Sequence, residues 1–347
     1  MNKGIFFIPL DDQDKQNDLL FDEIIDQTIE SEKLGLNEAF FGEHITDKHE
    51  KISSSLSMVS ALSRVTKKIN LGTLTTNLNF FKPATIAAII SQVDNLVKGR
   101  LLLGVGSGAN QSDVEAVDML DKNNHKIMLE TLGILENIFY DDKDVHIKTE
   151  NFNVSTSKSL NNDLGLGYFN KLYKERKNLE IVMPALNRDS YNVKLCAKNG
   201  WSIVISNFCS DDIIDNHIEN YIKHSSLTKE KALKKIRLSK FIFVTEDKKD
   251  SNKFLKDEDS PYLKAVDIIF KKLKTFNRHG CFGESINNSS QACEKIIFSG
   301  TPEMINKKMD YYKSKYGDFL SLVYVDVPKV SNDIYKNSLT LFAKHVK

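Results

Sequence analysis

The sequence lacks the cysteine and metal-ligand patterns that mark disulfide-bonded or zinc-binding proteins. Its four cysteines are widely spaced and form no C-x-x-C pair. It contains no H-E-x-x-H motif and no cluster of carboxylates around a pair of histidines. Scattered thiols of this kind are typical of a reducing compartment. We therefore expect a cytoplasmic protein without a metal site or a disulfide framework.

The sequence also has little net charge and no long apolar run. It has 48 Lys and Arg residues against 47 Asp and Glu residues, which gives a formal net charge of +1 at pH 7. The two signs are mixed along the chain, so no basic surface favours nucleic acid. No run approaches the roughly 20 apolar residues of a membrane span, and the apolar run near the N-terminus is too short for a signal peptide. We expect neither nucleic acid nor a membrane as a partner.

What the chain does contain is eight short apolar segments, each followed by residues with helical spacing. Several segments are continuously apolar, which is typical of parallel strands buried on both faces. Eight strand–helix units within 347 residues fit one α/β barrel. We predict a (β/α)8 TIM barrel that spans residues 1–347 as a single domain, with insertions after strands four and seven. The predicted strands are 4–9, 37–41, 69–76, 101–105, 179–183, 201–206, 238–245 and 319–325.

The stretch 69–110 carries the clearest pattern for a ligand site. Pro83 opens a helix where its missing N–H costs nothing, and Gly99 ends that helix. In parallel α/β folds, ligands gather where strands end at their carboxyl side. Two neighbouring strands end here in small or polar residues, and we expect a ligand with flat polar edges to lie across them. These residues are Thr75, Asn77, Gly106, Ser107 and Gly108.

The same glycines fit a competing motif. Gly104 to Ala109 satisfies G-x-G-x-x-G/A after a strand, the fingerprint of dinucleotide-binding domains. In such a domain, a strand ending in an acid follows about 20 residues later, and the motif belongs to the first strand–helix unit. Here the next interval is polar and then helical, and three units precede the loop. This context argues against a nicotinamide site.

Several short motifs follow one another in order along the chain. They are Phe41-Gly42-Glu43-His44, Leu71-Gly72-Thr73, Pro83, Gly99-Arg100, Gly104-Val105-Gly106-Ser107-Gly108 and Ser299-Gly300-Thr301-Pro302-Glu303. Their order and spacing resemble the bacterial luciferase-like family of flavin-dependent monooxygenases. The segment Gly106–Asp113 is most similar to the limonene and diketocamphane monooxygenases of that family. The resemblance touches most of the chain and is weakest in 141–177 and 248–290.

This resemblance implies a TIM barrel that binds reduced FMN (FMNH2) delivered by a separate flavin reductase. It implies a monooxygenase that transfers one oxygen atom from O2 to a small apolar substrate, such as an alkene, a cyclic ketone or an aldehyde-like compound. It also implies a homodimer. By the same resemblance, Glu43, Thr75, Asn77 and the loop Gly106–Gly108 are assigned to the flavin.

His44 follows strand two, on the barrel face where such enzymes react, and the resemblance at Glu43-His44 implies that it has the catalytic role. An imidazole with a pKa near neutrality is suited to donate a hydrogen bond or to shuttle a proton beside reduced flavin and O2. A loop histidine without a role is the alternative from position alone. Many relatives carry a second histidine where this chain has Ile45, which suggests a more apolar substrate pocket.

A phosphate site is expected after strand five, at the start of the next helix. Backbone N–H groups at a helix N-terminus suit a dianion, and the family's phosphate contacts resemble this location. An ordinary capped helix start is the alternative. We assign Arg188, Ser190 and Tyr191 to the phosphate. His125, or its neighbour Lys126, stands where many relatives have an arginine near the phosphate.

Two further readings stay open. A deazaflavin (F420)-dependent oxidoreductase of the same superfamily would transfer hydride and ignore O2. A non-catalytic flavin-binding protein would keep the barrel without turnover. For the monooxygenase, the polar, glycine-bearing segment Arg278–Ser290 is a candidate lid that excludes water.

Overall fold

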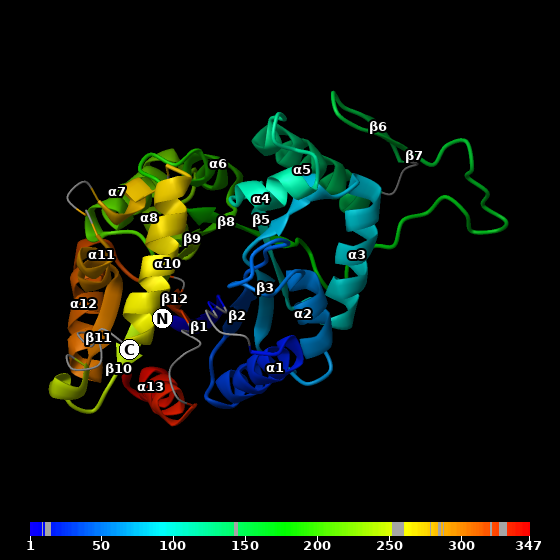
Figure 1. The fold of residues 1–347 in the computed structure, drawn as a ribbon. Coiled ribbons are helices and arrows are strands. Elements are labelled where there is room, and N and C mark those ends of the chain that lie inside the picture. Colours follow the sequence, from blue (N-terminus) through cyan, green and yellow to red (C-terminus); the bar gives the residue numbers. More distant parts are fainter. Residues whose placement is uncertain are drawn as a thin grey trace.

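A computed structural model of the chain has a closed barrel of parallel strands surrounded by helices (Figure 1). It describes residues 1–8, 10, 15–141, 145–251, 260–277, 279–283, 286, 288–319, 321–325 and 332–347. Among these residues, no helix is both long enough and apolar enough to cross a membrane.

Eight of the described strands form the closed ring, and each runs parallel to both of its neighbours. The predicted TIM-barrel fold is confirmed, and every ring strand overlaps a strand predicted from the sequence. In ring order the strands are β1 (Asn2–Phe7), β2 (Glu38–Phe41), β3 (Asn70–Thr73), β5 (Leu101–Gly106), β8 (Glu180–Ala185), β9 (Ser202–Ile205), β10 (Ile236–Val244) and β12 (Ser321–Val325).

Further short strands lie outside the ring. β4 (Thr76–Asn77) pairs with the end of β5, and β11 (Ile297–Gly300) pairs with the carboxyl half of β10. β6 (His146–Lys148) and β7 (Asn153–Ser155) form an antiparallel hairpin. The sequence pattern missed β11, because its two apolar residues, Ile297 and Phe298, give too short a signal directly before a helix. It also predicted one strand over 69–76, which the structure interrupts at a cis peptide bond between Leu74 and Thr75.

The helices cover the outside of the ring (Figure 1). Pro83 is the first residue of α3, as the sequence predicts, and Gly99 follows this helix with a φ of +75°, which glycine adopts without strain. The helices are α1 (Asn17–Lys33), α2 (Ser55–Leu62), α3 (Pro83–Leu96), α4 (Gln111–Ala116), α5 (Asn124–Tyr140), α6 (Tyr191–Asn199), α7 (Asp211–His224), α8 (Lys229–Leu233), α10 (Pro261–Thr275), α11 (Ser289–Ile296), α12 (Pro302–Lys315) and α13 (Asn332–His345), with 3₁₀ turns η1 (Leu78–Phe80) and η2 (His279–Phe282).

The two longest connections between ring strands leave β5 and β10. The first passes through α4, α5 and the hairpin β6–β7, and Figure 1 shows the hairpin and the chain after it extending away from the barrel. The second contains α10, η2, α11, β11 and α12. That these connections are insertions stays a prediction. The predicted lid Arg278–Ser290 lies in the second connection, and its residues 278, 284, 285 and 287 are outside the described residues.

A buried ion-pair network closes the amino ends of the strands. The Arg237 guanidinium donates to both carboxylate oxygens of Glu38, at 2.8 and 3.0 Å, and to Glu180 Oε1 at 2.8 Å. Ser321 and Ser202 donate hydroxyl hydrogen bonds to the same two carboxylates. We call Arg237, Glu38 and Glu180 the floor network. Because it joins β10, β2 and β8 across the barrel interior, it forms a charged floor at the amino end.

Candidate functional site

A cavity of about 650 Å³ lies at the carboxyl ends of the ring strands. Residues from the ends of β1, β5, β8 and β9, from the loops after β2 and β3, and from α10 line it. Every residue assigned to the site from the sequence is among them, and they come from five separate segments of the chain. These residues are Glu43, His44, Thr75, Asn77, Gly106, Ser107, Gly108, His125, Arg188, Ser190 and Tyr191.

The glycine loop lies close to the end of β3 because it carries no side chain at the point of contact. A Cβ atom on Gly106 would lie 2.1 Å from Thr75 Oγ1 and 2.7 Å from Asn77 Oδ1. Asn77 Oδ1 accepts hydrogen bonds from the Gly108 backbone N–H at 3.0 Å and from the Thr75 hydroxyl at 3.2 Å. Asn77 therefore ties the glycine loop and the end of β3 into one edge of the cavity.

Glu43 holds neighbouring segments of the site together through hydrogen bonds. One carboxylate oxygen accepts hydrogen bonds from the Ser55 backbone N–H at 2.9 Å and the Ser55 hydroxyl at 2.6 Å, and the other accepts from the Asn77 backbone N–H at 3.2 Å. Burial raises the pKa of Glu43 against the effect of these hydrogen bonds. The carboxylate therefore joins the loop after β2 to the start of α2 and to β4.

His44 is held by carboxylates on two sides. Its Nδ1 lies 2.7 Å from Asp113 Oδ2, and its Nε2 lies 3.5 Å from Glu50 Oε2. Asp113, on α4, is only 1% exposed and also accepts hydrogen bonds from the backbone N–H groups of Ile45 and Thr46. Asp113 thus fixes both the imidazole ring and the loop that carries it.

These carboxylates set the charge of His44. Burial by itself lowers the pKa of the imidazole, but the negative charges of Glu50 and Asp113 outweigh it and raise the pKa of His44 to about 9. The ring is therefore an imidazolium at neutral pH. The expectation of a pKa near neutrality is wrong, because the two acids come from parts of the chain that the local motif does not contain. At neutral pH, His44 is a proton donor and not a base.

Lys272 on α10 completes this group of charges. Its ammonium donates to Glu50 Oε1 at 2.9 Å and also to Asp47. Although burial lowers the pKa of Lys272, the two acids outweigh it and raise that pKa above its usual value. Lys272 therefore attaches α10 to the loop after β2 and balances both acids. We call His44, Asp47, Glu50, Asp113 and Lys272 the mouth network.

The predicted phosphate corner forms at the N-terminus of α6. Ser190 is the N-cap residue, and its side chain makes no capping hydrogen bond within the described residues. The rings of Tyr191 and His125 meet edge to face, with centroids 5.1 Å apart. Arg188 is 45% exposed and pairs with Asp212 at 2.5 Å. The helix start therefore offers uncapped donors to an anion, while Arg188 shares its charge with Asp212.

Three polar atoms on the cavity wall are buried and have no hydrogen-bond partner in the part of the chain that is described. They are His125 Nε2, Asn207 Nδ2 and Ser239 Oγ. Burial lowers the pKa of His125, so its imidazole is neutral at pH 7. An unpartnered buried polar group costs about 1–3 kcal/mol, so these three atoms are places in the cavity where a bound polar group would restore a hydrogen bond. Lys126 does not line the cavity and pairs with Glu150.

Much of the remaining wall is apolar. Ile269, Leu273 and Phe276 come from α10 and the residue after it, and Phe6 and Phe208 come from β1 and the loop after β9. An apolar wall with a few placed polar groups is typical of a small-molecule site. The cavity is therefore suited to an uncharged body with polar edges.

Sequence reasoning missed Glu50, Lys272, Asn207 and Ser239. Asn207 and Ser239 gave a positional signal, since one follows a predicted strand and the other lies within one. Asp113 lies in the segment that resembles limonene and diketocamphane monooxygenases, so the sequence contained a signal for it too. Glu50 and Lys272 gave none, because charged residues are common and 222 positions separate the pair.

Comparison with known proteins gives the site a family context. Residues 1–159 match the luciferase-like monooxygenase family. An uncharacterized protein of Sinorhizobium fredii is 36% identical over 111 residues, which is 32% of each chain. The 2,5-diketocamphane 1,2-monooxygenase 1 of Pseudomonas putida is 21% identical over 100% of this chain and 98% of its own length.

Solved structures share the whole fold. The oxygenating constituent of the 3,6-diketocamphane monooxygenase of Pseudomonas putida, a type II Baeyer–Villiger monooxygenase in complex with FMN, has a TM-score of 0.85 at 18% identity, with 100% of this chain and 97% of that chain covered. An F420-dependent secondary alcohol dehydrogenase has a TM-score of 0.70 at 14% identity, with 100% and 99% covered. The predicted resemblance is confirmed as a similarity: residues 1–159 match the luciferase-like monooxygenase family, and the whole chain shares its barrel fold with these solved structures.

Proposed function

We propose that the protein is a monooxygenase that binds reduced FMN in the cavity at the carboxyl ends of the strands. It transfers one oxygen atom of O2 to a small apolar substrate, and the other oxygen atom leaves as water. The observation that carries this proposal is the set of three unpartnered buried polar atoms, His125 Nε2, Asn207 Nδ2 and Ser239 Oγ, around one largely apolar cavity. A flavin combines a flat apolar body with polar edges and matches such a wall. The named activities of the Pseudomonas relatives support the same reaction.

The residues present fit FMN. The missing side chain of Gly106 lets Thr75 and Asn77 pack against the glycine loop, and together they present a polar edge to the cavity on which a flat ring could lie. The N-terminus of α6, with Ser190, offers backbone donors to a phosphate. Reduced flavin bound here supplies the two electrons that activate O2.

His44 holds a proton beside this position. Its Nδ1–H donates to Asp113, and as an imidazolium it carries a second proton on Nε2. A charged donor inside a sheltered cavity stabilises negative charge that develops on oxygen. Asp113 keeps the ring in one orientation, which makes it a positioning residue for His44.

The cavity wall supports an uncharged substrate. The side chains from α10, together with Phe6 and Phe208, provide an apolar surface that limits access of water to the reacting atoms. Lys272 offers no unbalanced charge to an anionic substrate, because Asp47 and Glu50 already pair with it. An alkene, a cyclic ketone or an aldehyde-like compound is therefore the proposed substrate class.

A separate flavin reductase is the proposed source of FMNH2. The Pseudomonas structure is of an oxygenating constituent, a description that implies a second component in that system. The homodimer and the cytoplasmic location stay predictions. A reconstitution assay with a flavin reductase, NADH and FMN tests the need for a second component, since oxygenation is expected only when all three are present.

The cofactor is tested by anaerobic titration of the purified protein with FMNH2 and, separately, with reduced F420. We expect saturable binding of FMNH2 and, in air, a product one oxygen atom heavier from a panel of a monoterpene ketone, a monoterpene alkene and a long-chain aldehyde. Isotopic O2 should label that product. Binding of F420 alone, with hydride transfer and no O2 uptake, would contradict the proposal in favour of a deazaflavin enzyme. The F420-dependent relatives share the barrel and make this comparison necessary.

His44→Ala tests for a flavin-binding protein without turnover. We expect the variant to bind FMNH2 but to give less product and more H2O2 for each flavin oxidised, because the proton donor is lost. An unchanged product yield would mean that His44 has no part in the reaction.

A further inference from the structure

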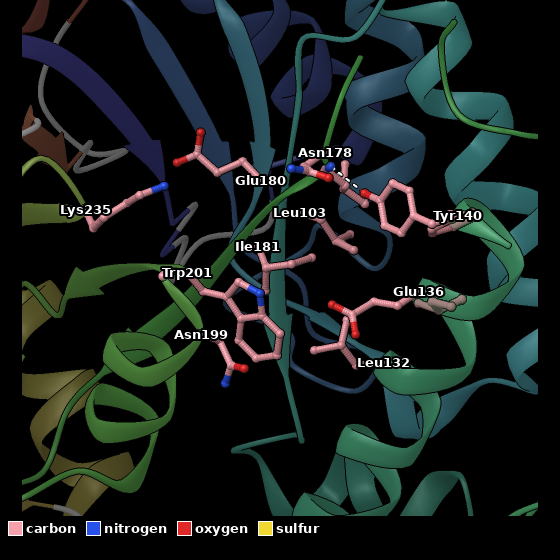
Figure 2. Close-up of a pocket in the computed structure, with 14 residues that line it drawn as sticks. Leu103, Leu132, Glu136, Tyr140, Asn178, Glu180, Ile181, Asn199, Trp201 and Lys235 are labelled. Carbon is pink, nitrogen blue, oxygen red and sulfur yellow. Dashed lines mark hydrogen bonds between the residues drawn. The ribbon is translucent and has the colours of Figure 1, made fainter. Parts of the chain in front are cut away.

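A second cavity, of about 500 Å³, lies at the amino end of the barrel (Figure 2). It is bounded by α5 on one side and by the turn from α6 into β9 on the other. Leu103, Ile181 and Leu132 form apolar parts of its wall. It shares no lining residue with the candidate active site, so it is a separate place on the molecule.

Two side chains give this amino-end cavity its chemical character. Figure 2 shows the indole of Trp201 on one side of Ile181 and the carboxylate of Glu136 on the other. Trp201 is the single tryptophan of the sequence. Within the described ranges, Glu136 has no salt-bridge partner, and burial raises the pKa of its carboxyl. An unbalanced acid therefore faces an aromatic ring across an open space.

The other charges in this cavity are balanced. Glu180 pairs with Arg237 at 2.8 Å and accepts a hydrogen bond from Ser202. Lys235 lies close enough to Glu180 to lower the pKa of that carboxyl, as does Arg237, although burial opposes both. Glu136 is thus the acid in this cavity that a positively charged ligand could neutralise.

We propose that the amino-end cavity binds a small organic cation, an amine with an apolar body, with its charge at Glu136 and its body against Trp201. A carboxylate without a cationic partner attracts an ammonium group, and an indole offers a large apolar surface to the body of the ligand. The apolar wall accepts the hydrocarbon part of the ligand. This site is independent of the flavin site, and its test does not require turnover.

The fluorescence of Trp201 reports this cavity directly, because no other tryptophan contributes. The probes are 2-phenylethylammonium and its neutral analogue 2-phenylethanol, added to the purified full-length protein. We expect a saturable change in emission with the ammonium, and at least about fivefold weaker binding of the alcohol. Equal affinities, or no saturable change with the ammonium, would overturn the proposal.

Glu136→Gln keeps the shape of the side chain and removes its charge. We expect this variant to bind the ammonium at least about fivefold more weakly and the alcohol unchanged. Glu294→Gln, an exposed acid on α11 outside the cavity, is the matched control and is expected to bind like the wild type. Circular dichroism checks that both variants are folded. Wild-type affinity of folded Glu136→Gln for the ammonium would refute the assignment of Glu136.

Discussion

The floor network and the mouth network lie at opposite ends of one barrel and differ in the exposure of their cationic side chains, although Glu180 of the floor network is 33% exposed. In the floor network, the side chains of Arg237 and Glu38 are 1% and 3% exposed. In the mouth network, those of His44 and Lys272 are 22% and 26% exposed, and both residues line the cavity. Charges at the floor contact other strands of the barrel, whereas charges at the mouth remain accessible to a ligand.

This difference separates structural charges from functional ones. Two ions that leave water completely lose hydration, and their mutual contacts must offset that loss, so removal of one partner damages the fold. Charges on a cavity wall keep some hydration and instead shift one another's pKa values. We therefore expect substitutions in the floor network to lower the free energy of unfolding. We expect substitutions in the mouth network to change the pKa of His44 and the affinity for a ligand.

The largest expected effect is at the floor. Arg237→Met leaves Glu38 buried without its cation, and we expect the free energy of unfolding to fall by about 3–5 kcal/mol in urea titrations. The double variant Arg237→Met/Glu38→Leu should recover much of that loss, because no unpaired charge remains. If Arg237→Met were as stable as the wild type, the floor network would not be needed for the stability of the fold.

The next effect is a pH dependence at the mouth. The pKa of His44 in the folded protein, about 9, lies above its usual value of 6.5. The protonated ring therefore stabilises the fold fully below pH 6.5, and this contribution, at most about 3 kcal/mol, is lost as the pH rises through 9. Urea titrations at several pH values should show that the wild type loses more stability over this window than His44→Gln. Parallel pH profiles would contradict the raised pKa.

Gly106→Ala should act on the ligand and less on the fold. The added Cβ would displace the side chains of Thr75 and Asn77, which line the proposed flavin position. We expect FMNH2 affinity to fall by at least about tenfold in anaerobic titrations, or about 1.4 kcal/mol. If the folded variant binds FMNH2 like the wild type, the ring does not lie along this edge.

Glu50→Gln tests the mouth network more finely. Loss of this negative charge should lower the pKa of His44 by about one unit, measured from the imidazole C–H signals by NMR. Glu115→Gln, on the same helix as Asp113 but exposed, is the control and should change that pKa much less. An unchanged pKa of His44 in Glu50→Gln would mean that Asp113 alone sets it.

The smallest effect is expected at Gly133, within α5. A Cβ atom there would meet no heavy atom within 4 Å. Gly133→Ala should therefore raise the free energy of unfolding by about 0.5–1 kcal/mol, since alanine favours a helix, and leave FMNH2 binding unchanged. A loss of stability would show that this glycine, like Gly106, has a local role.

The sequence predicts the ring strands because each is a short, mostly apolar segment bounded by glycine, proline or polar residues. It also predicts part of the cavity wall, since strand order brings the carboxyl ends together and the family resemblance adds residues such as Glu43 and His125. His44 and the loop Gly106–Gly108 belong to such ends. Chain order is thus sufficient for the position of the site.

The charge of the site is not predictable in this way. The pKa of His44 depends on Glu50 and Asp113, and Glu50 in turn pairs with Lys272, which is 222 positions away. The floor network joins Glu38 to Arg237 across 199 positions. Such ion pairs depend on which side chains point into the closed barrel, and the local sequence around each residue does not predict this.

The central claim is that the mouth of the barrel holds reduced FMN beside a protonated His44 and shields it from water. The most direct test is rapid mixing of the anaerobic protein–FMNH2 complex with oxygenated buffer, while the return of oxidised FMN is followed by absorbance. We predict that oxidised FMN returns much more slowly from the complex than from free FMNH2. Return at the rate of the free flavin would contradict the claim.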